Sequence, residues 1–221
     1  MNIVIFGATG MIGQAVLREA LLDVAVTQVL TVGRTITGQQ HPKLREISHA
    51  DLFDLASIAN EFRDVDATLF CLGVSSAGMS EAAYKRVTYD LTVSVARTML
   101  AAQSKMTFVY VSGAGTDRSA KGRVMWARVK GATENQLLGM GFKAAYMFRP
   151  GFIQPMHGIR SRTPSYNVIY AVLGPLYPLL KAVVPAFITN TEVLGRAMLR
   201  VARDGAETRL IEQRDINRLG G

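Results

Sequence analysis

The residues that decide the fold stand at the start of the chain: Ile3-Val4-Ile5-Phe6-Gly7-Ala8-Thr9-Gly10-Met11-Ile12-Gly13. An apolar run of strand length leads directly into three glycines spaced three apart, and a helical pattern follows over residues 11–22. In such a turn the first glycine permits the tight bend, the second lets backbone N–H groups approach a pyrophosphate, and the third lets the helix pack on the strand. The helix N-terminus then faces the phosphates. The stretch predicts a dinucleotide-binding loop formed by Gly7, Thr9, Gly10, Met11, Ile12 and Gly13.

The rest of the chain repeats this alternation of strand-length apolar runs and helical patterns. Further strands are expected over residues 29–32, 44–47, 67–71, 107–111 and 144–148, and further helices over about 80–103 and 124–138. Strands that alternate with crossover helices are typical of a parallel sheet covered on both faces. The sequence therefore predicts the α/β class, with a doubly wound parallel sheet of at least six strands, the NAD(P)-binding Rossmann fold.

The pattern changes after Pro150. Residues 151–165 read as a loop, a helix is expected from a cap at Asn190 or Thr191 to about Arg203, and residues 209–211 read as a late strand. This tail is too short for a core of its own. We therefore expect one domain over residues 1–221, with 151–221 as a small lobe on the substrate side of the sheet's carboxyl edge. The apolar, proline-broken segment 166–188 fits a substrate lid, a dimer face, a surface that touches lipid, or plain core.

The composition limits the other classes of protein. The chain has 221 residues, 49% of them hydrophobic and 19% charged, which argues against disorder. One cysteine, Cys71, excludes an internal disulfide and a cysteine-rich zinc site, and the three histidines lack metal-ligand spacing. Met1 runs into a strand without a signal peptide, and no apolar run is long enough to span a membrane. These features predict a cytoplasmic protein without a bound metal.

The net charge of +8 is unevenly distributed. Residues 1–117 hold nine Lys and Arg against eleven Asp and Glu, whereas residues 118–221 hold sixteen against six. A basic half can attract nucleic acid, anionic lipid or a phosphorylated ligand. Here the basic residues are scattered, without a dense run or aromatic interleaving, which argues against nucleic acid. A basic cleft for a cofactor and a small-molecule substrate is the plainer interpretation, and the oligomeric state is left open.

The end of the second strand indicates which dinucleotide binds. An acidic residue there would hold the adenosine ribose and favour NAD. This chain instead has Val32-Gly33-Arg34-Thr35, and no carboxylate lies between Asp23 and Glu46. A guanidinium at Arg34 can pair with a 2′-phosphate and stack on adenine. We therefore expect NADP as the cofactor in preference to NAD.

With these residues in view, the chain resembles the short-chain dehydrogenase/reductase superfamily over nearly its whole length. It is similar to the atypical, extended-like branch that contains the Tat-interacting oxidoreductase and bacterial epimerase-like proteins. The resemblance is carried by Phe6-Gly7-Ala8-Thr9-Gly10, Gly33-Arg34, Asp51-Leu52, Cys71-Leu72-Gly73, Val111-Ser112-Gly113-Ala114, Val129-Lys130-Gly131 and Arg149-Pro150-Gly151.

The resemblance implies roles for these positions. Asp51 and Leu52 would flank the adenine, and Cys71, Leu72 and Gly73 would line the adenine ribose. Ser112 falls where the superfamily has a substrate-orienting serine. Lys130 falls on the lysine that binds the nicotinamide ribose and lowers the pKa of a catalytic tyrosine. The loop that would lie beside the nicotinamide is Arg149, Pro150 and Gly151.

One departure bears on catalysis. The superfamily writes its catalytic pair as Tyr-x-x-x-Lys, and this chain has Trp126-Ala127-Arg128-Val129-Lys130. A phenol can pass a proton to a forming alkoxide, whereas an indole N–H is only a hydrogen-bond donor. The usual mechanism therefore lacks its acid, unless another group such as Tyr84 supplies it.

Two functions remain open at this point. The first is an NADP-dependent oxidoreductase or epimerase-like enzyme that acts on an apolar carbonyl or alcohol, or on a sugar-like substrate, with Ser112 and Lys130 as catalytic residues. The second is a non-catalytic module that binds NADP to sense or regulate, which the tryptophan at position 126 favours. The fold alone does not distinguish them.

Overall fold

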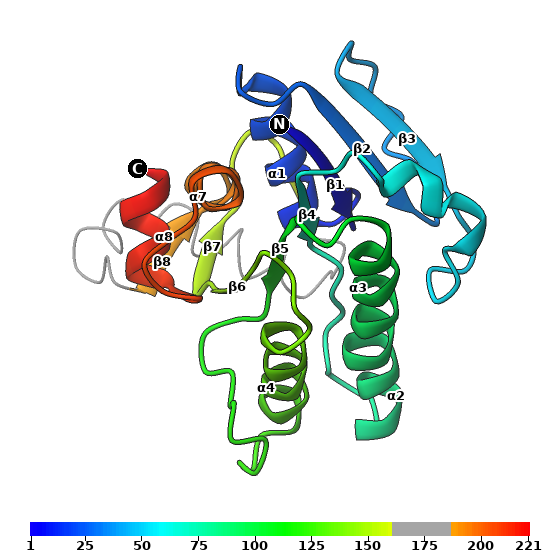
Figure 1. Cartoon of the computed structure of the whole chain (residues 1–221). Coiled ribbons are helices and arrows are strands. Elements are labelled where there is room, and N and C mark those ends of the chain that lie inside the picture. The colour runs from blue at the N-terminus through cyan, green and yellow to red at the C-terminus, as the bar shows by residue number, and fades with distance from the viewer. Residues whose placement is uncertain (161–186) are drawn as a thin grey trace.

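The computed structural model describes residues 1–160 and 187–221, and its centre is a parallel sheet of seven strands (Figure 1). The strand order is β3-β2-β1-β4-β5-β6-β9, so the chain crosses over between β3 and β4. This arrangement confirms the predicted doubly wound sheet. The strands are β1 (Asn2–Phe6), β2 (Gln28–Gly33), β3 (Leu44–Ser48), β4 (Ala67–Phe70), β5 (Thr107–Val111), β6 (Ala144–Arg149) and β9 (Leu210–Glu212).

Helices cover both faces of the sheet, and each face has its own core. One core joins α1 (Met11–Leu22), α7 (Thr191–Asp204) and α8 (Gln213–Gly220) to the sheet. The other is formed with the 3-10 helix η1 (Ala56–Phe62), α3 (Leu91–Ala102) and α4 (Met125–Leu138). In Figure 1, α3 and α4 lie together on one side, away from α1 and α7.

The first strand shows why the apolar run became a central strand. Ile3 and Ile5 belong to the core under α1, whereas Val4 and Phe6 belong to the core under α3, and all four are at most 1% exposed. Successive side chains of a strand point to opposite faces, so a strand buried on both sides needs a continuous apolar run. Full burial of each such side chain contributes about 1.5–3 kcal/mol.

The helix expected over residues 80–103 contains a discontinuity. It is divided into α2 (Glu81–Lys85), a π-helical turn η2 (Arg86–Asp90) and α3. The hydroxyl of Thr92 donates to the carbonyl of Thr88 across the end of this turn. The apolar period continues through the turn, so the sequence pattern did not reveal it.

The C-terminal residues add an edge strand to the main sheet and two helices to one of its faces. The expected strand pairs in parallel with β6, α7 packs against α1, and α8 packs against α7. The loop expected over 151–165 was wrong in part, because β7 (Phe152–Gln154) pairs in parallel with β8 (Ile188–Asn190). Each of these two strands has only three residues.

Residues 161–186, which include most of the apolar segment 166–188, lie outside the described residues. The lid, dimer or lipid role expected for this segment therefore stays a prediction. Of the helices that are described, none is long and apolar enough to cross a bilayer. Within residues 1–160 and 187–221, no cluster of three potential metal ligands was found.

Candidate nucleotide-binding site

The glycine loop after β1 has the geometry that a phosphate needs. Gly7 has a φ of 84°, in the left-handed region, and its carbonyl accepts a hydrogen bond of 2.9 Å from the N–H of Gly10. A Cβ at Gly13 would lie 2.0 Å from that carbonyl oxygen, so only glycine lets α1 pack this close. The first N–H groups of a helix lack intrahelical partners and carry partial positive charge. Met11 and Ile12 belong to this first turn of α1, and their N–H groups are the ones predicted to bind an anion.

A cavity of about 280 Å³ opens beside this loop, at the carboxyl ends of β1 and β2. Five of the residues predicted to contact the cofactor line it, and they come from four separate parts of the chain: Gly7, Thr9, Arg34, Leu52 and Leu72. Leu52 and Leu72 supply apolar surface, and Arg34 supplies an exposed cation at the rim. A wall of this kind fits a purine with an anionic group beside it.

A carboxylate lies close to this cavity but is already engaged. Glu46 of β3 accepts hydrogen bonds from the Thr31 hydroxyl and from the N–H groups of Thr37 and Gly38, each at 2.9 Å. Burial raises the pKa of Glu46, but these hydrogen bonds outweigh it, so the pKa is lowered overall. Glu46 thus orders the turn after β2, and Arg34 is the charged group at the cavity itself.

The remaining residues expected around the adenosine have different environments. Asp51 is exposed, and its carboxylate accepts a hydrogen bond of 2.9 Å from the N–H of Phe53. Burial raises the pKa of the Cys71 thiol to about 12, so the thiol is protonated at neutral pH. A Cβ at Gly73 would meet no atom within 4 Å, so the backbone there is open to a ligand.

Ser112 and Lys130 meet at the end of β5, in the register that the resemblance implies. The ammonium of Lys130 donates to the carbonyl oxygen of Ser112. Burial lowers the pKa of Lys130 to about 8, although the carboxylate of Glu134 opposes this shift. The Ser112 side chain is only 3% exposed, and its hydroxyl lies 2.6 Å from a carboxylate oxygen of Glu134. The pKa of the Lys130 amine is thus close to neutral pH, while the Ser112 hydroxyl is buried.

The loop after β6 is fixed by its neighbours. The guanidinium of Arg149 pairs with Glu134 and with Glu212, so its charge is neutralised within the protein. The carbonyl of Pro150 accepts from the N–H of Ala114 at 2.9 Å. The N–H of Gly151 donates to the side-chain oxygen of Gln213 at 2.7 Å. Contacts from this loop to a cofactor remain a prediction, and they would come from its backbone.

The two residues considered for the proton donor lie in different settings. Trp126, in the first turn of α4, is half-buried, and a Cβ at Gly115 would lie 3.7 Å from its ring. The indole therefore lies beside the loop that follows Ser112. Tyr84 is only 2% exposed, in α2, and packs within the core. Of the two, Trp126 is the more accessible from the carboxyl edge.

Glu134 is the residue that sequence reasoning missed. It is fully buried in α4, between Ser112 and Arg149. In sequence, Lys130 and Glu134 read as an ordinary exposed pair four residues apart on a helix. The signal that could have identified Glu134 is its position on the same helix as buried Ala127 and Leu137, on their face.

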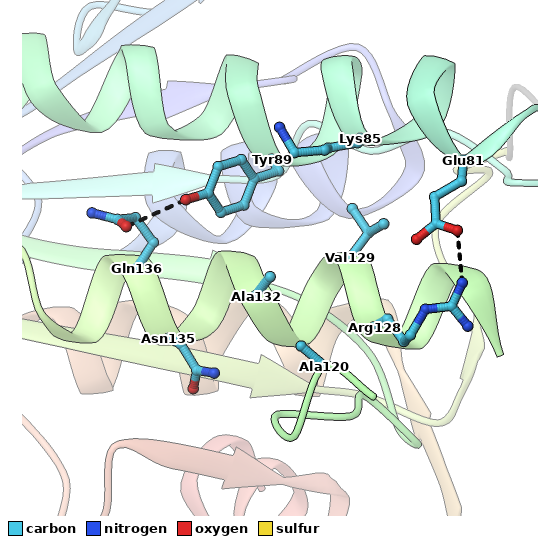
Figure 2. A pocket seen from close by; sticks show the side chains of 9 residues that line it. All are labelled: Glu81, Lys85, Tyr89, Ala120, Arg128, Val129, Ala132, Asn135 and Gln136. Atoms are coloured by element: carbon cyan, nitrogen blue, oxygen red, sulfur yellow. Dashed lines mark hydrogen bonds and ion pairs between the residues drawn. The ribbon is translucent and has the colours of Figure 1, made fainter. Parts of the chain in front are cut away.

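A larger groove, of about 680 Å³, lies between α2 and α4 (Figure 2). Its lining contains none of the residues predicted to bind the cofactor. Its polar groups are paired across it, since Arg128 contacts Glu81 at 2.7 Å and the Tyr89 hydroxyl donates to Gln136 at 3.3 Å. The groove is therefore separate from the nucleotide site.

The glycine loop, the cavity beside it and the strand order together define a dinucleotide-binding protein of the Rossmann class. A family model described as NAD(P)H-binding matches residues 7–140, which is more than half of the chain. The chain belongs to this NAD(P)H-binding family.

Curated relatives extend over the full chain. A protein of Aspergillus terreus, named protein fmp52-2, mitochondrial, is 28% identical over 98% of this chain and 95% of its own length. Its namesake in Aspergillus oryzae is 26% identical over 98% and 95%, respectively. These relatives are named as mitochondrial proteins, which contradicts the expected cytoplasmic location.

Solved structures share the fold. MoeE5, determined with UDP-glucose and NAD, has a TM-score of 0.66 at 17% identity and covers 95% of this chain and 74% of its own. The UDP-glucose 4-epimerase of Thermotoga maritima has a TM-score of 0.65 at 13% identity, with 92% and 74% covered. These likenesses show the fold, and they confirm the predicted α/β architecture with a parallel sheet.

Proposed function

We propose that this protein binds NADP and acts as an oxidoreductase of the short-chain dehydrogenase/reductase type. The observation that carries the proposal is the cavity in which Arg34 stands beside the glycine loop. A guanidinium offers paired N–H donors to a phosphate, and no such advantage exists for a free ribose hydroxyl. The substrate we propose is a carbonyl or alcohol of apolar or sugar-like character.

The residues of the site would have two roles, which are cofactor binding and proton transfer. The bound dinucleotide would supply hydride transfer. The glycine loop and α1 would hold the pyrophosphate through backbone N–H groups, and Arg34 would hold the 2′-phosphate. Lys130 would lie beside the nicotinamide ribose, where its lowered pKa places it close to proton exchange at neutral pH. The backbone of Pro150 and Gly151 would border the nicotinamide.

The second candidate is a protein that binds NADP without turnover. The observation that favours it is Trp126, because an indole cannot deliver the proton that a phenol delivers. This candidate shares the cofactor site with the first. The two are separated by following NADPH oxidation in a panel of aldehydes, ketones and sugar nucleotides, since only the enzyme consumes the cofactor.

The test of the cofactor is a fluorescence titration with NADPH and with NADH. A charge-assisted hydrogen bond contributes about 1.5–3 kcal/mol, so NADPH is expected to bind about ten- to a hundredfold more tightly. Arg34→Ala should remove most of this difference while leaving NADH binding nearly unchanged. Arg63→Ala changes an exposed arginine at the C-terminal end of η1, outside the cavity lining, and should leave both affinities as they are. Equal affinities of the two cofactors for the unaltered protein would refute the choice of NADP.

A further inference from the structure

A buried carboxylate connects the ends of two strands to one helix. Glu134 of α4 is fully buried, and one of its oxygens lies 2.6 Å from the Ser112 hydroxyl at the end of β5. The same oxygen accepts a hydrogen bond of 2.9 Å from Nε of Arg149 at the end of β6, and a second guanidinium nitrogen contacts the other oxygen. Removing one partner of a buried ion pair leaves an uncompensated charge and is strongly destabilising.

Lys130 lies one helical turn before Glu134 and is tied to the same serine. Its ammonium donates to the Ser112 carbonyl, while Glu134 holds the Ser112 side chain. Two successive turns of α4 therefore contact Ser112, one through its backbone carbonyl and the other through its hydroxyl. Any change at Glu134 acts on the position of Ser112 and on the electrostatic field at Lys130.

The charged groups around Lys130 come from three elements, and two buried phenols lie on two others. Glu134 lies on its own helix, Arg149 on β6, and Glu212 at the end of β9 pairs with the outer side of Arg149. The phenols of Tyr110 on β5 and Tyr84 on α2 are buried, and burial raises the pKa of Tyr110, so that phenol is neutral.

The opposite face of α4 carries a separate set of charges. There Arg128 of α4 pairs with Glu81 of α2 at 2.7 Å, across the open groove of Figure 2. Lys85 of α2 pairs with Asp90 of η2. These pairs are solvated and largely neutralise one another. Among the described residues, the buried cluster around Ser112 thus holds two cations, Lys130 and Arg149, against one fully buried carboxylate.

We propose that Glu134 is a positioning residue, which fixes the Ser112 hydroxyl and sets the charge state of Lys130 at the carboxyl edge of the sheet. The proposal deepens the proposed function and rests on it for its catalytic consequence, because Ser112 and Lys130 are the residues expected beside the nicotinamide. Arg149 completes the arrangement by cancelling the charge of Glu134, so that Lys130 feels only part of that charge.

The direction of each charge change follows from electrostatics. An anion nearby favours a protonated amine, and a cation nearby disfavours it. Glu134→Gln removes the anion and leaves Arg149, which cannot be deprotonated, so the titration midpoint of Lys130 should fall. Arg149→Gln removes the cation and leaves Glu134, so the midpoint should rise. The double variant removes both and should return the midpoint towards its original value.

The experiment is an NMR titration of protein labelled with ¹³C in its lysine side chains, in which Lys130→Arg assigns the resonance. We expect Glu134→Gln to lower the midpoint by about one unit and Arg149→Gln to raise it by a similar amount. Lys105, which is exposed, is an internal reference that should not move. The matched control is Glu81→Gln, which removes the α2 carboxylate paired with Arg128 across the groove and should leave Lys130 unchanged.

The outcome that overturns the proposal is an unchanged midpoint, or shifts in the same direction, in the two single variants. If Glu134→Gln alone fails to fold, the comparison of Arg149→Gln with the double variant still isolates Glu134, and a lack of difference between them refutes the proposal. The titration is made without cofactor. A failure of NADPH to bind would therefore count against the proposed function while leaving this coupling intact.

Discussion

Trp126 is the residue on which the choice between an enzyme and a binding module depends. It occupies the position, four residues before Lys130 on one helix face, where the superfamily resemblance implies a tyrosine. General acid catalysis typically contributes a factor of about 10² to 10⁴ in rate. We predict that Trp126→Tyr raises NADPH-dependent carbonyl reduction and leaves NADPH affinity nearly unchanged, because the glycine loop and Arg34 are untouched. The measurement is NADPH oxidation against the substrate panel.

The dependence on Lys130 provides the control for this prediction. With Lys130→Ala added, the phenol loses the neighbouring cation that lowers its pKa, and the gained activity should disappear. Brisk turnover by the unaltered protein, with no gain in Trp126→Tyr, would show that a different group delivers the proton.

The contrast between Gly13 and Glu134 shows which site residues a sequence can reveal. Gly13 was predictable because its chemistry is local: a strand, a turn and a helix follow one another, and the close contact with the Gly7 carbonyl lies within the same motif. Glu134 was not, because its partners Ser112 and Arg149 lie 22 and 15 residues away on two strands. A buried ion pair is a property of the assembled core, which one helix pattern does not display.

The α7 helix begins as the sequence predicts, and its cap can be tested. The side chain of Asn190 accepts a hydrogen bond of 2.8 Å from the N–H of Val193. Replacing an N-cap by alanine costs about 1 kcal/mol, which lowers the melting temperature by roughly 2–4 °C in a chain of this size. We predict this loss for Asn190→Ala by thermal circular dichroism. Asn190→Asp keeps an acceptor and should melt near the original temperature, and equal losses in both variants would contradict the capping role.

The central strands that the sequence predicted have a buried apolar pattern that is long enough to recognise. The central strands β1, β4 and β5 are continuous apolar runs because both faces of the sheet are covered. The short pair β7 and β8, with three residues each, was not predicted, although β9, which is equally short, was expected over residues 209–211. The helix α8 was also missed: its sequence Gln213–Gly220 is mostly polar, and only Ile216 among its apolar side chains is fully buried.

Strands from both ends of the chain belong to the same seven-stranded sheet. The N-terminal strand lies at the centre of the sheet, and the last strand, β9, closes its edge beside β6. The helix α7 packs on α1, so residues after 187 cover the helix that follows the glycine loop. The described residues 187–221 therefore share a core with α1 and the sheet.

This shared core predicts the effect of ending the chain at Asp204. The truncation removes β9 and α8, and with them Ile211 and Ile216, which are 1% and 0% exposed. Loss of two fully buried side chains costs about 3–6 kcal/mol, a large part of the roughly 5–15 kcal/mol that stabilises a native protein. It also removes Glu212 from Arg149 and Gln213 from Gly151. We predict that the truncated chain loses its cooperative thermal transition or melts at least about 10 °C lower.

Removal of the exposed Gly221 alone is the matched control, because it takes away one terminal N–H bond to Asn217 and no buried side chain. That variant should melt like the full chain and titrate with NADPH as the full chain does. If the chain ending at Asp204 also melts cooperatively at the original temperature, β9 and α8 lie outside the cooperative unit. The nucleotide-binding part would then fold on its own, and the expectation of one domain over residues 1–221 would be wrong.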